Sequence, residues 1–126
     1  IKRGGYVLRD ADEARAVIIA TGSEVELALK AQLQLADEGL AVRVVSMPCT
    51  RLFDQQTRSY IEAVLPPNLP RVAVEAGVTD YWRKYVGLTG EVVGIDSVGE
   101  SAPASVLFEH FGITPAAVGK AVKAVL

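Results

Sequence analysis

Ala16-Val17-Ile18-Ile19-Ala20-Thr21-Gly22-Ser23-Glu24 is the stretch of sequence that decides the fold of this chain. Its first five residues are apolar without alternation, which is typical of a strand covered by helices on both faces. Ser23-Glu24-Val25-Glu26 then has the form of a capping box, so Ser23 is the predicted N-cap of a helix. A buried strand that leads straight into a helix predicts an α/β fold.

The helix after this strand is predicted to end at Gly39, because glycine adopts positive φ at little cost. Its apolar residues recur at helical spacing, and its polar residues lie toward the other side. The predicted apolar stripe comprises Val25, Ala28, Leu29, Leu33 and Ala36, and the polar side comprises Lys30, Gln34, Asp37 and Glu38.

Further strands and helices alternate along the rest of the chain. The predicted strands are residues 5–9, as an edge strand or a strand that enters from a linker, and residues 42–47, 71–75 and 92–95. One helix is predicted to begin near Asp54 and to end before Pro66-Pro67, and another to begin near Ser101-Ala102-Pro103 and to end at Gly112. The last predicted helix begins at Thr114-Pro115, with Thr114 as its cap. Its predicted apolar stripe comprises Val118, Ala121, Val122 and Val125. This alternation predicts a single domain over residues 1–126, with a mostly parallel sheet in a three-layer α/β/α arrangement and right-handed crossovers.

Composition excludes several functional classes. The 126 residues carry a net charge of −2 without a basic run, which argues against binding of nucleic acid or of an anionic membrane. No apolar stretch approaches the roughly 20 residues that span a bilayer. The single cysteine, Cys49, cannot form an internal disulfide, so a reducing, cytoplasmic setting is expected. The opening Ile1-Lys2-Arg3-Gly4-Gly5 lacks an initiator methionine, which suggests a piece of a longer protein.

Thr21-Gly22-Ser23-Glu24 is the first candidate site, because ligands of open α/β sheets gather at the carboxyl ends of strands. Free N–H groups at the start of the helix could hold a phosphate. However, the stretch has one glycine and no nucleotide-binding motif, and Glu24 and Glu26 would repel an anion. A helix cap is therefore favoured over an anion site.

Other residue types that carry chemistry also have structural explanations. Glu75 and Glu100, the latter in Gly99-Glu100-Ser101-Ala102-Pro103, could form an acid/base pair, although hydrogen bonding to loop backbone is favoured. The only histidine, His110, stands near a helix end where cations are favoured, without a predicted catalytic partner. Cys49 has only Arg51 as a basic neighbour and is predicted to be a small buried thiol.

The aromatic stretch Asp80-Tyr81-Trp82-Arg83-Lys84-Tyr85 is the most unusual in the chain. Aromatic residues with arginine are typical of buried interfaces, and the same residues could instead pack in the core. Both alternatives remain open at this point. Stacking on nucleic-acid bases is disfavoured because no wider basic surface supports it.

Several of these segments, in order and over nearly the whole chain, resemble the C-terminal domain of transketolase. The segments that carry the resemblance are 4–8, 19–25, 44–48, 71–77, 80–82, 84–88 and 99–103, which include Ile19-Ala20-Thr21-Gly22-Ser23-Glu24-Val25 and Gly99-Glu100-Ser101-Ala102-Pro103.

The resemblance implies a domain of a larger enzyme that transfers a two-carbon ketol unit between sugar phosphates in the pentose phosphate pathway. It implies thiamine diphosphate and a divalent metal, Mg²⁺ or Ca²⁺, in the parent enzyme, which is expected to be a homodimer. The family places the cofactor and substrate residues in the preceding domains, and none of those motifs is found here. No catalytic, cofactor-binding or metal-binding residue is therefore assigned to this chain, and the isolated chain is expected to be inactive. The resemblance also implies a five-stranded mixed sheet whose first strand is antiparallel.

Three hypotheses for the role of the domain follow. The first is a structural domain that supports the dimer or the neighbouring domain, with Tyr81 to Tyr85 as a candidate contact. The second is a regulatory domain that binds a small molecule near Thr21-Gly22-Ser23 and Gly99-Glu100-Ser101. The third is the equivalent domain of a related thiamine enzyme, such as a deoxyxylulose-phosphate synthase or a 2-oxo acid dehydrogenase.

Overall fold

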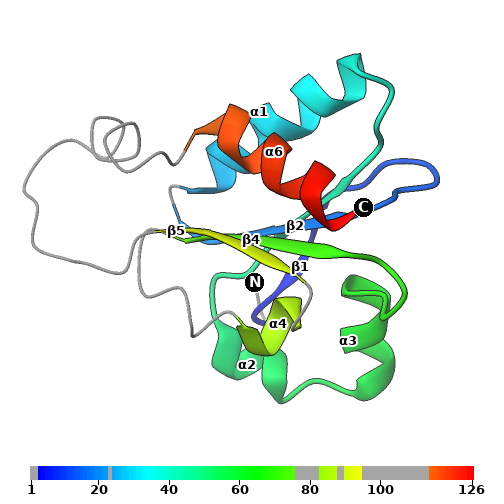
Figure 1. The fold of residues 1–126 in the computed structure, drawn as a ribbon. Helices are drawn as coiled ribbons and strands as arrows, with labels where there is room; N and C mark the ends of the chain where they lie inside the picture. The colour runs from blue at the N-terminus through cyan, green and yellow to red at the C-terminus, as the bar shows by residue number, and fades with distance from the viewer. Residues whose placement is uncertain (1–2, 23, 76–82, 88–89, 95–113) are drawn as a thin grey trace, which may run out of the picture.

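A mixed five-stranded sheet forms the middle of the computed structural model (Figure 1). The structure describes residues 3–22, 24–75, 83–87, 90–94 and 114–126. The described strands are β1 (Tyr6–Arg9), β2 (Val17–Ala20), β3 (Arg43–Ser46), β4 (Arg71–Glu75) and β5 (Glu91–Gly94). Their spatial order is β1-β3-β2-β4-β5, with β1 antiparallel to β3 and the other pairs parallel. The predicted mixed sheet with an antiparallel first strand at its edge is confirmed.

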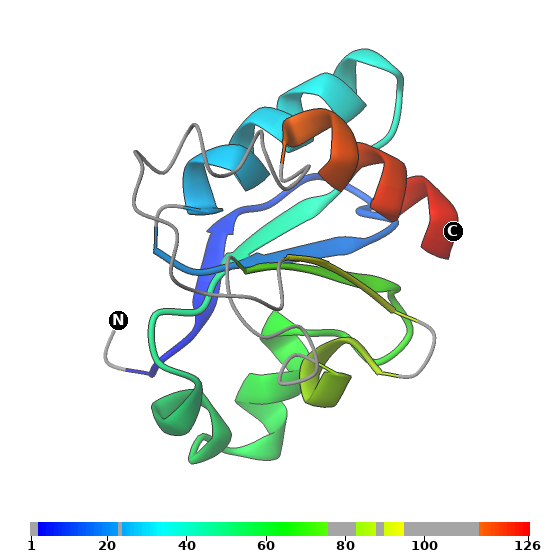
Figure 2. The same ribbon diagram turned by 60° about the vertical axis from the view of Figure 1, so that its left-hand side comes forward.

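Helices cover both faces of this sheet, as Figure 2 shows in side view. The helices α1 (Glu24–Asp37) and α6 (Pro115–Val125) lie on one face. The shorter helices α2 (Thr50–Asp54), α3 (Arg58–Val64) and α4 (Arg83–Val86) lie on the other. The three-layer α/β/α prediction is therefore confirmed.

The central strand β2 contributes to both cores. Ile18 packs on the α1 and α6 side with Val44 and Val72, which are its partners in the neighbouring strands. Ile19 packs on the opposite side, where the core includes Phe53 and Tyr85. Successive side chains of a strand point to opposite faces, so a strand covered on both faces must be apolar throughout. This is the physical reason for the uninterrupted apolar run in the sequence.

The buried face of α1 differs from the predicted stripe. Leu33 is 57% exposed, whereas Ala31 and Leu35 are buried. Ala36 is also exposed, although Ala28 is buried as predicted. This helix has apolar residues around much of its circumference, so spacing alone did not select one face. The sheet and α6 pack against the side of α1 that carries Ala28, Ala31 and Leu35, and so bury it. Gly119 of α6 lies close to the side chain of Leu35.

The ends of the helices test the predicted caps. Gly39 follows α1 with φ of 82°, as expected for a helix-stopping glycine, while Ser23 lies outside the described residues. Thr114 caps α6, because its Oγ1 accepts a hydrogen bond from the N–H of Ala117 at 3.1 Å. The predicted apolar stripe of α6 is also confirmed, since Val118 and Val122 are fully buried.

The helix predicted before Pro66-Pro67 is confirmed as α3, but its predicted start near Asp54 is wrong. Asp54 is the last residue of α2, and α3 begins four residues later. Thr57 separates the two helices, because its side chain accepts a hydrogen bond from the N–H of Tyr60 at 3.2 Å and so caps α3. The short helix α4 was not predicted, and the helix expected between Ser101 and Gly112 lies outside the described residues.

Candidate functional site

The residues that follow β2 occupy the carboxyl end of this strand, where a ligand would be expected. Gly22 is exposed with φ of 54°, and the next described residue, Glu24, is only 6% exposed. A Cβ built on Gly22 would lie 3.5 Å from Glu24 Oε2, so the carboxylate lies against the backbone that an anion would approach. The N–H of Glu24 donates to the carbonyl of Thr21 at 3.0 Å. This geometry favours the helix start over the anion site.

The other predicted candidates do not assemble into a described site. Glu75 is the last residue of β4, and the segment Gly99 to Pro103 and His110 lie outside the described residues. Cys49 is a free thiol that is partly exposed, which corrects its prediction as a buried thiol. It immediately precedes α2, and its N–H donates to the carbonyl of Gly4 at 3.0 Å.

The position of Tyr85 answers, for this residue, whether the aromatic stretch packs in the core or in an interface. It is 4% exposed and belongs to the core beneath the sheet. Its hydroxyl donates to the carboxylate of Asp54, at 3.0 Å from Oδ1 and 3.1 Å from Oδ2, and Lys84 Nζ lies 2.6 Å from Oδ2. Tyr85 therefore packs in the core, while residues 80–82 lie outside the described part of the chain.

Arg71, in β4, connects α3 and α4 on the face of the sheet that these helices cover. Its guanidinium donates to the carbonyl of Tyr85 at 2.7 Å and to the carbonyl of Leu65 at 3.0 Å. These carbonyls belong to the ends of α4 and α3, where a cation is stabilised by the helix dipole. Burial lowers the pKa of Arg71, which is still protonated at neutral pH. The positive charge of Arg71 therefore stabilises the ends of α3 and α4.

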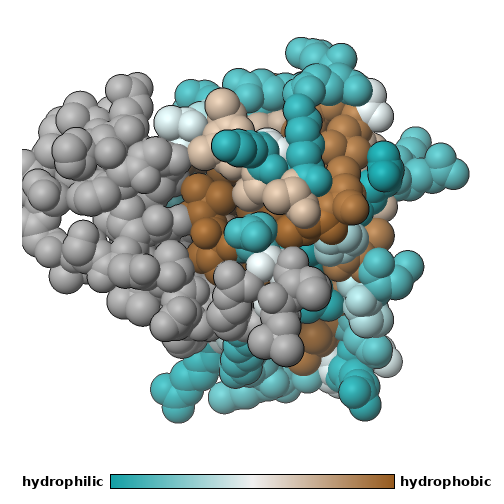
Figure 3. Space-filling model, viewed as in Figure 1, coloured by the Kyte–Doolittle hydropathy of each residue, from teal (hydrophilic) through white to brown (hydrophobic). Residues whose placement is uncertain are grey.

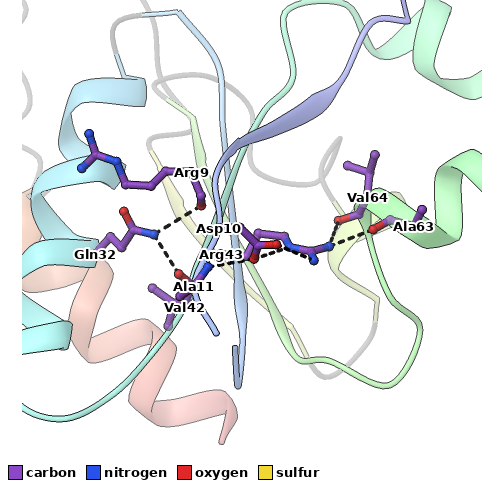
Figure 4. Close-up of polar contacts among 8 residues, drawn as sticks. All are labelled: Arg9, Asp10, Ala11, Gln32, Val42, Arg43, Ala63 and Val64. Atoms are coloured by element: carbon purple, nitrogen blue, oxygen red, sulfur yellow. Dashed lines mark hydrogen bonds and ion pairs between the residues drawn. The ribbon is translucent and has the colours of Figure 1, made fainter. Parts of the chain in front are cut away.

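Arg43 and Asp10 form a second such connection (Figure 4). Arg43 Nε lies 3.0 Å from Asp10 Oδ1, and Nη2 lies 3.1 Å from Oδ2, which gives a bidentate pair. Arg43 Nη1 also donates to the carbonyls of Ala63 and Val64 at the end of α3, at 2.8 and 3.2 Å. Hydrogen bonding from Arg43 lowers the pKa of Asp10 below its ordinary value.

Gln32 of α1 was not identified as a candidate by the sequence reasoning. Its Nε2 donates to the carbonyls of Val42, at 2.9 Å, and Arg9, at 3.3 Å, and so connects α1 to the last residue of β1 and to the residue before β3 (Figure 4). Its Oε1 is buried without a hydrogen-bond partner among the described residues. Gln32 lies between Ala28 and Leu35 at helical spacing, so a correct assignment of the buried face would have marked it as a buried polar residue.

The described ranges contain neither a metal-binding cluster nor a membrane-spanning helix. No three His, Cys, Asp or Glu residues lie close enough together to hold a metal ion. No helix among them has the length and apolar character to cross a bilayer.

Comparison with known proteins finds one family. Residues 4–114 match the model of the transketolase-like TK C-terminal domain. The protein named "Transketolase, plasmid" from Cupriavidus necator is 60% identical over the whole chain. The structure of transketolase from Leishmania mexicana has a TM-score of 0.89 and 45% identity over 98% of the chain. A structure titled "Split gene transketolase, inactive beta4 tetramer" has a TM-score of 0.72 and 26% identity over the whole chain.

The chain spans only part of each of these proteins. It covers 19% of the Cupriavidus protein, 18% of the Leishmania chain and 43% of the split-gene chain. Most of each relative therefore lies outside the matched region.

Proposed function

Because this chain belongs to the transketolase family as its C-terminal domain, we propose that it is a non-catalytic structural domain of a larger ketol-transferring enzyme. The parent enzyme would move a two-carbon ketol unit between sugar phosphates. The observation that carries the proposal is the family match over residues 4–114, combined with coverage of only 19% of the related transketolase from Cupriavidus. The 60% identity favours transketolase over the related thiamine enzymes.

The described polar side chains support a structural role. Arg43 and Arg71 each bind helix-end carbonyls, and Asp54 receives hydrogen bonds from Tyr85 and Lys84. Groups committed to such contacts are not available to hold a substrate phosphate. The carboxylate of Glu24 also lies at the strand end where a ligand would be expected.

Thiamine diphosphate and Mg²⁺ or Ca²⁺ are the proposed cofactors of the parent enzyme. The described residues of this chain do not fit that cofactor, because they form no carboxylate cluster for the metal, and Glu24 opposes an anion at the start of α1. No catalytic step is therefore derived from residues of this chain. The cofactor would supply the carbanion chemistry elsewhere in the parent enzyme.

The proposed partners are the other domains of the parent enzyme, in a homodimer located in the cytoplasm. The similarity to a split-gene transketolase, of which the chain covers 43%, supports assembly with separate polypeptides. Hydrophobic residues extend across the α6 side of the described surface (Figure 3), and Leu126 at the end of α6 is 46% exposed. Such a surface is suited to packing against another domain. The net charge of −2 argues against nucleic acid and membranes as partners.

Calorimetry tests the non-catalytic assignment. The 126-residue chain is titrated with thiamine diphosphate in the presence of MgCl₂ or CaCl₂, and separately with a ketose phosphate. No saturable heat is expected, while the full-length enzyme serves as the positive control for each ligand. Saturable binding of thiamine diphosphate to the 126-residue chain would refute the proposal.

Deletion and rescue test the structural role. The full-length enzyme lacking this domain is expected to lose dimerisation, measured by analytical ultracentrifugation, together with ketol transfer. Addition of the 126-residue chain as a separate polypeptide is expected to restore both at least in part. Unchanged dimerisation and activity after the deletion would contradict the proposal.

A further inference from the structure

A hollow of about 430 Å³ lies between α1, the carboxyl end of β1 and the residues that lead into β3. Its lining includes Arg9, the last residue of β1, Asp10, which follows it, and Gln32 and Leu33 from α1. Known small-molecule pockets have volumes of about 300–1,000 Å³, so this hollow can hold a small ligand. The pairing of β1 with β3 shifts between Val7 and Arg9, and such irregularities often redirect side chains beside binding sites.

Gln32 provides an unused hydrogen-bond acceptor in this lining. The orientation of its amide is determined by Nε2, which donates to two carbonyls, because the reverse orientation would place Oε1 against two acceptors. Oε1 is consequently buried with no donor among the described residues, in a side chain that is 6% exposed overall. Buried acceptors of this kind are uncommon, so the missing donor of this one needs an explanation.

The charged and apolar groups around Gln32 limit the class of ligand. Arg9 is exposed, and no ion pair to its guanidinium is found among the described residues. Asp10 adds a carboxylate on the same wall, while the opposite wall carries Leu33, which is 57% exposed, and Ala36. The hollow therefore combines the cation of Arg9, the unpaired acceptor of Gln32, the carboxylate of Asp10, which is already paired with Arg43, and an apolar surface.

We propose that this hollow binds a small aliphatic α-amino acid in its zwitterionic form. The carboxylate pairs with Arg9, the ammonium group donates to Gln32 Oε1 and approaches Asp10, and the aliphatic side chain packs on Leu33. Figure 4 shows the side chain of Arg9 extending past Gln32 toward α1. Because this side chain is exposed, it can move to admit the ammonium group to the buried oxygen.

Nuclear magnetic resonance tests the proposal at the residue concerned. The ¹⁵N-labelled chain is titrated with L-leucine, and the side-chain amide signal of Gln32 reports on the site directly. Saturable shifts of this signal are expected. Isoamylamine, which lacks the carboxylate, and 2-hydroxyisocaproate, which lacks the ammonium group, are each expected to bind about tenfold more weakly, as for loss of one charge-assisted contact.

Two pairs of variants separate the site from the general surface. Arg9→Gln and Leu33→Ser are expected to weaken the binding of L-leucine about tenfold. The matched controls Arg51→Gln and Leu52→Ser change exposed residues of α2 outside the lining and are expected to leave binding unchanged. All four positions are exposed, so the variants are expected to fold.

Three results would overturn the proposal. The first is the absence of a saturable shift of the Gln32 signal with L-leucine. The second is equal binding of isoamylamine, 2-hydroxyisocaproate and L-leucine, because the site would then recognise neither charged group. The third is an equal loss of binding in the Arg9→Gln and Arg51→Gln variants.

Discussion

Gly4 and Gly39 have nearly the same backbone conformation but different surroundings. Their φ angles are 80° and 82°. A Cβ at Gly4 would lie 2.2 Å from the carbonyl oxygen of Cys49 and 2.4 Å from the nitrogen of Phe53, whereas a Cβ at Gly39 would meet nothing within 4 Å. The two positions therefore separate backbone strain from steric clash.

We expect Gly4→Ala to lower the free energy of unfolding by about 3 kcal/mol, because strain and clash with rigid backbone add together. Gly39→Ala is expected to lower it by about 1 kcal/mol through strain alone. Chemical denaturation followed by circular dichroism measures both values. Equal losses in the two variants would show that the close approach at Gly4 has no energetic effect.

The pairing of Asp10 with Arg43 predicts that the free energy of unfolding depends on pH. Its pKa is lowered below 3.8 in the folded chain, chiefly by hydrogen bonding from Arg43. A lowered folded-state pKa stabilises the fold above the unfolded pKa, and this contribution is lost as the pH falls through the folded value. Because the Asp10 side chain is 53% exposed, the pair is expected to contribute only about 0.5 kcal/mol.

Titration of the Asp10 carboxyl carbon by nuclear magnetic resonance checks this prediction. A midpoint below 3.8 is expected in the wild-type chain, with a return toward the ordinary value in Arg43→Gln. The stability difference between the wild-type chain and Asp10→Asn should shrink as the pH falls below about 4. An unchanged midpoint in Arg43→Gln would contradict the assignment of the shift to this pair.

At the scale of elements, α6 depends on the cap that its first residues encode. Thr114 Oγ1 accepts from the N–H of Ala117, and Pro115 occupies the first turn. Thr114→Ala is expected to lower the free energy of unfolding by about 1 kcal/mol, while Thr114→Ser keeps the acceptor and should cost much less. Thermal and chemical denaturation measure both variants. An equal loss in the serine variant would attribute the effect to the methyl group and not to the cap.

The elements also show where local sequence patterns were sufficient. The cap and stripe of α6 were predicted correctly, because Thr114-Pro115 and the spacing of Val118 and Val122 agree with each other. The prediction that Leu33 belongs to the buried side of α1 was wrong. Apolar residues occur around much of the circumference of this helix, so the elements that pack against it decide which side is buried. Thr57 was overlooked as a cap, so the start of α3 was placed too early, near Asp54, and α2 was not predicted.

At the scale of the whole molecule, the sheet predicts a gradient of protection from solvent. β2 is paired on both sides, with β3 and β4, and its four residues are fully buried. β1 is paired on one side only and lies at the sheet edge. We expect the amides of β2 to exchange with solvent most slowly and those of β1 substantially faster, as measured by hydrogen–deuterium exchange. Exchange of β1 as slow as that of β2 would contradict this gradient.

The sequence by itself determined the fold class and the family. A strand that is buried on both faces needs an uninterrupted apolar run, and residues 16–20 supply one without reference to any other segment. The succession of motifs over residues 4–114 likewise identifies the family.

Only the tertiary structure decided which polar groups meet. Gln32, Arg9 and Val42 come from three different segments, and their hydrogen bonds form only because the sheet brings those segments together. The same holds for Asp10 and Arg43, which are 33 residues apart. Such contacts depend on the positions of distant residues and not on local spacing, which is why sequence patterns predicted the apolar strand but not the hollow beside it.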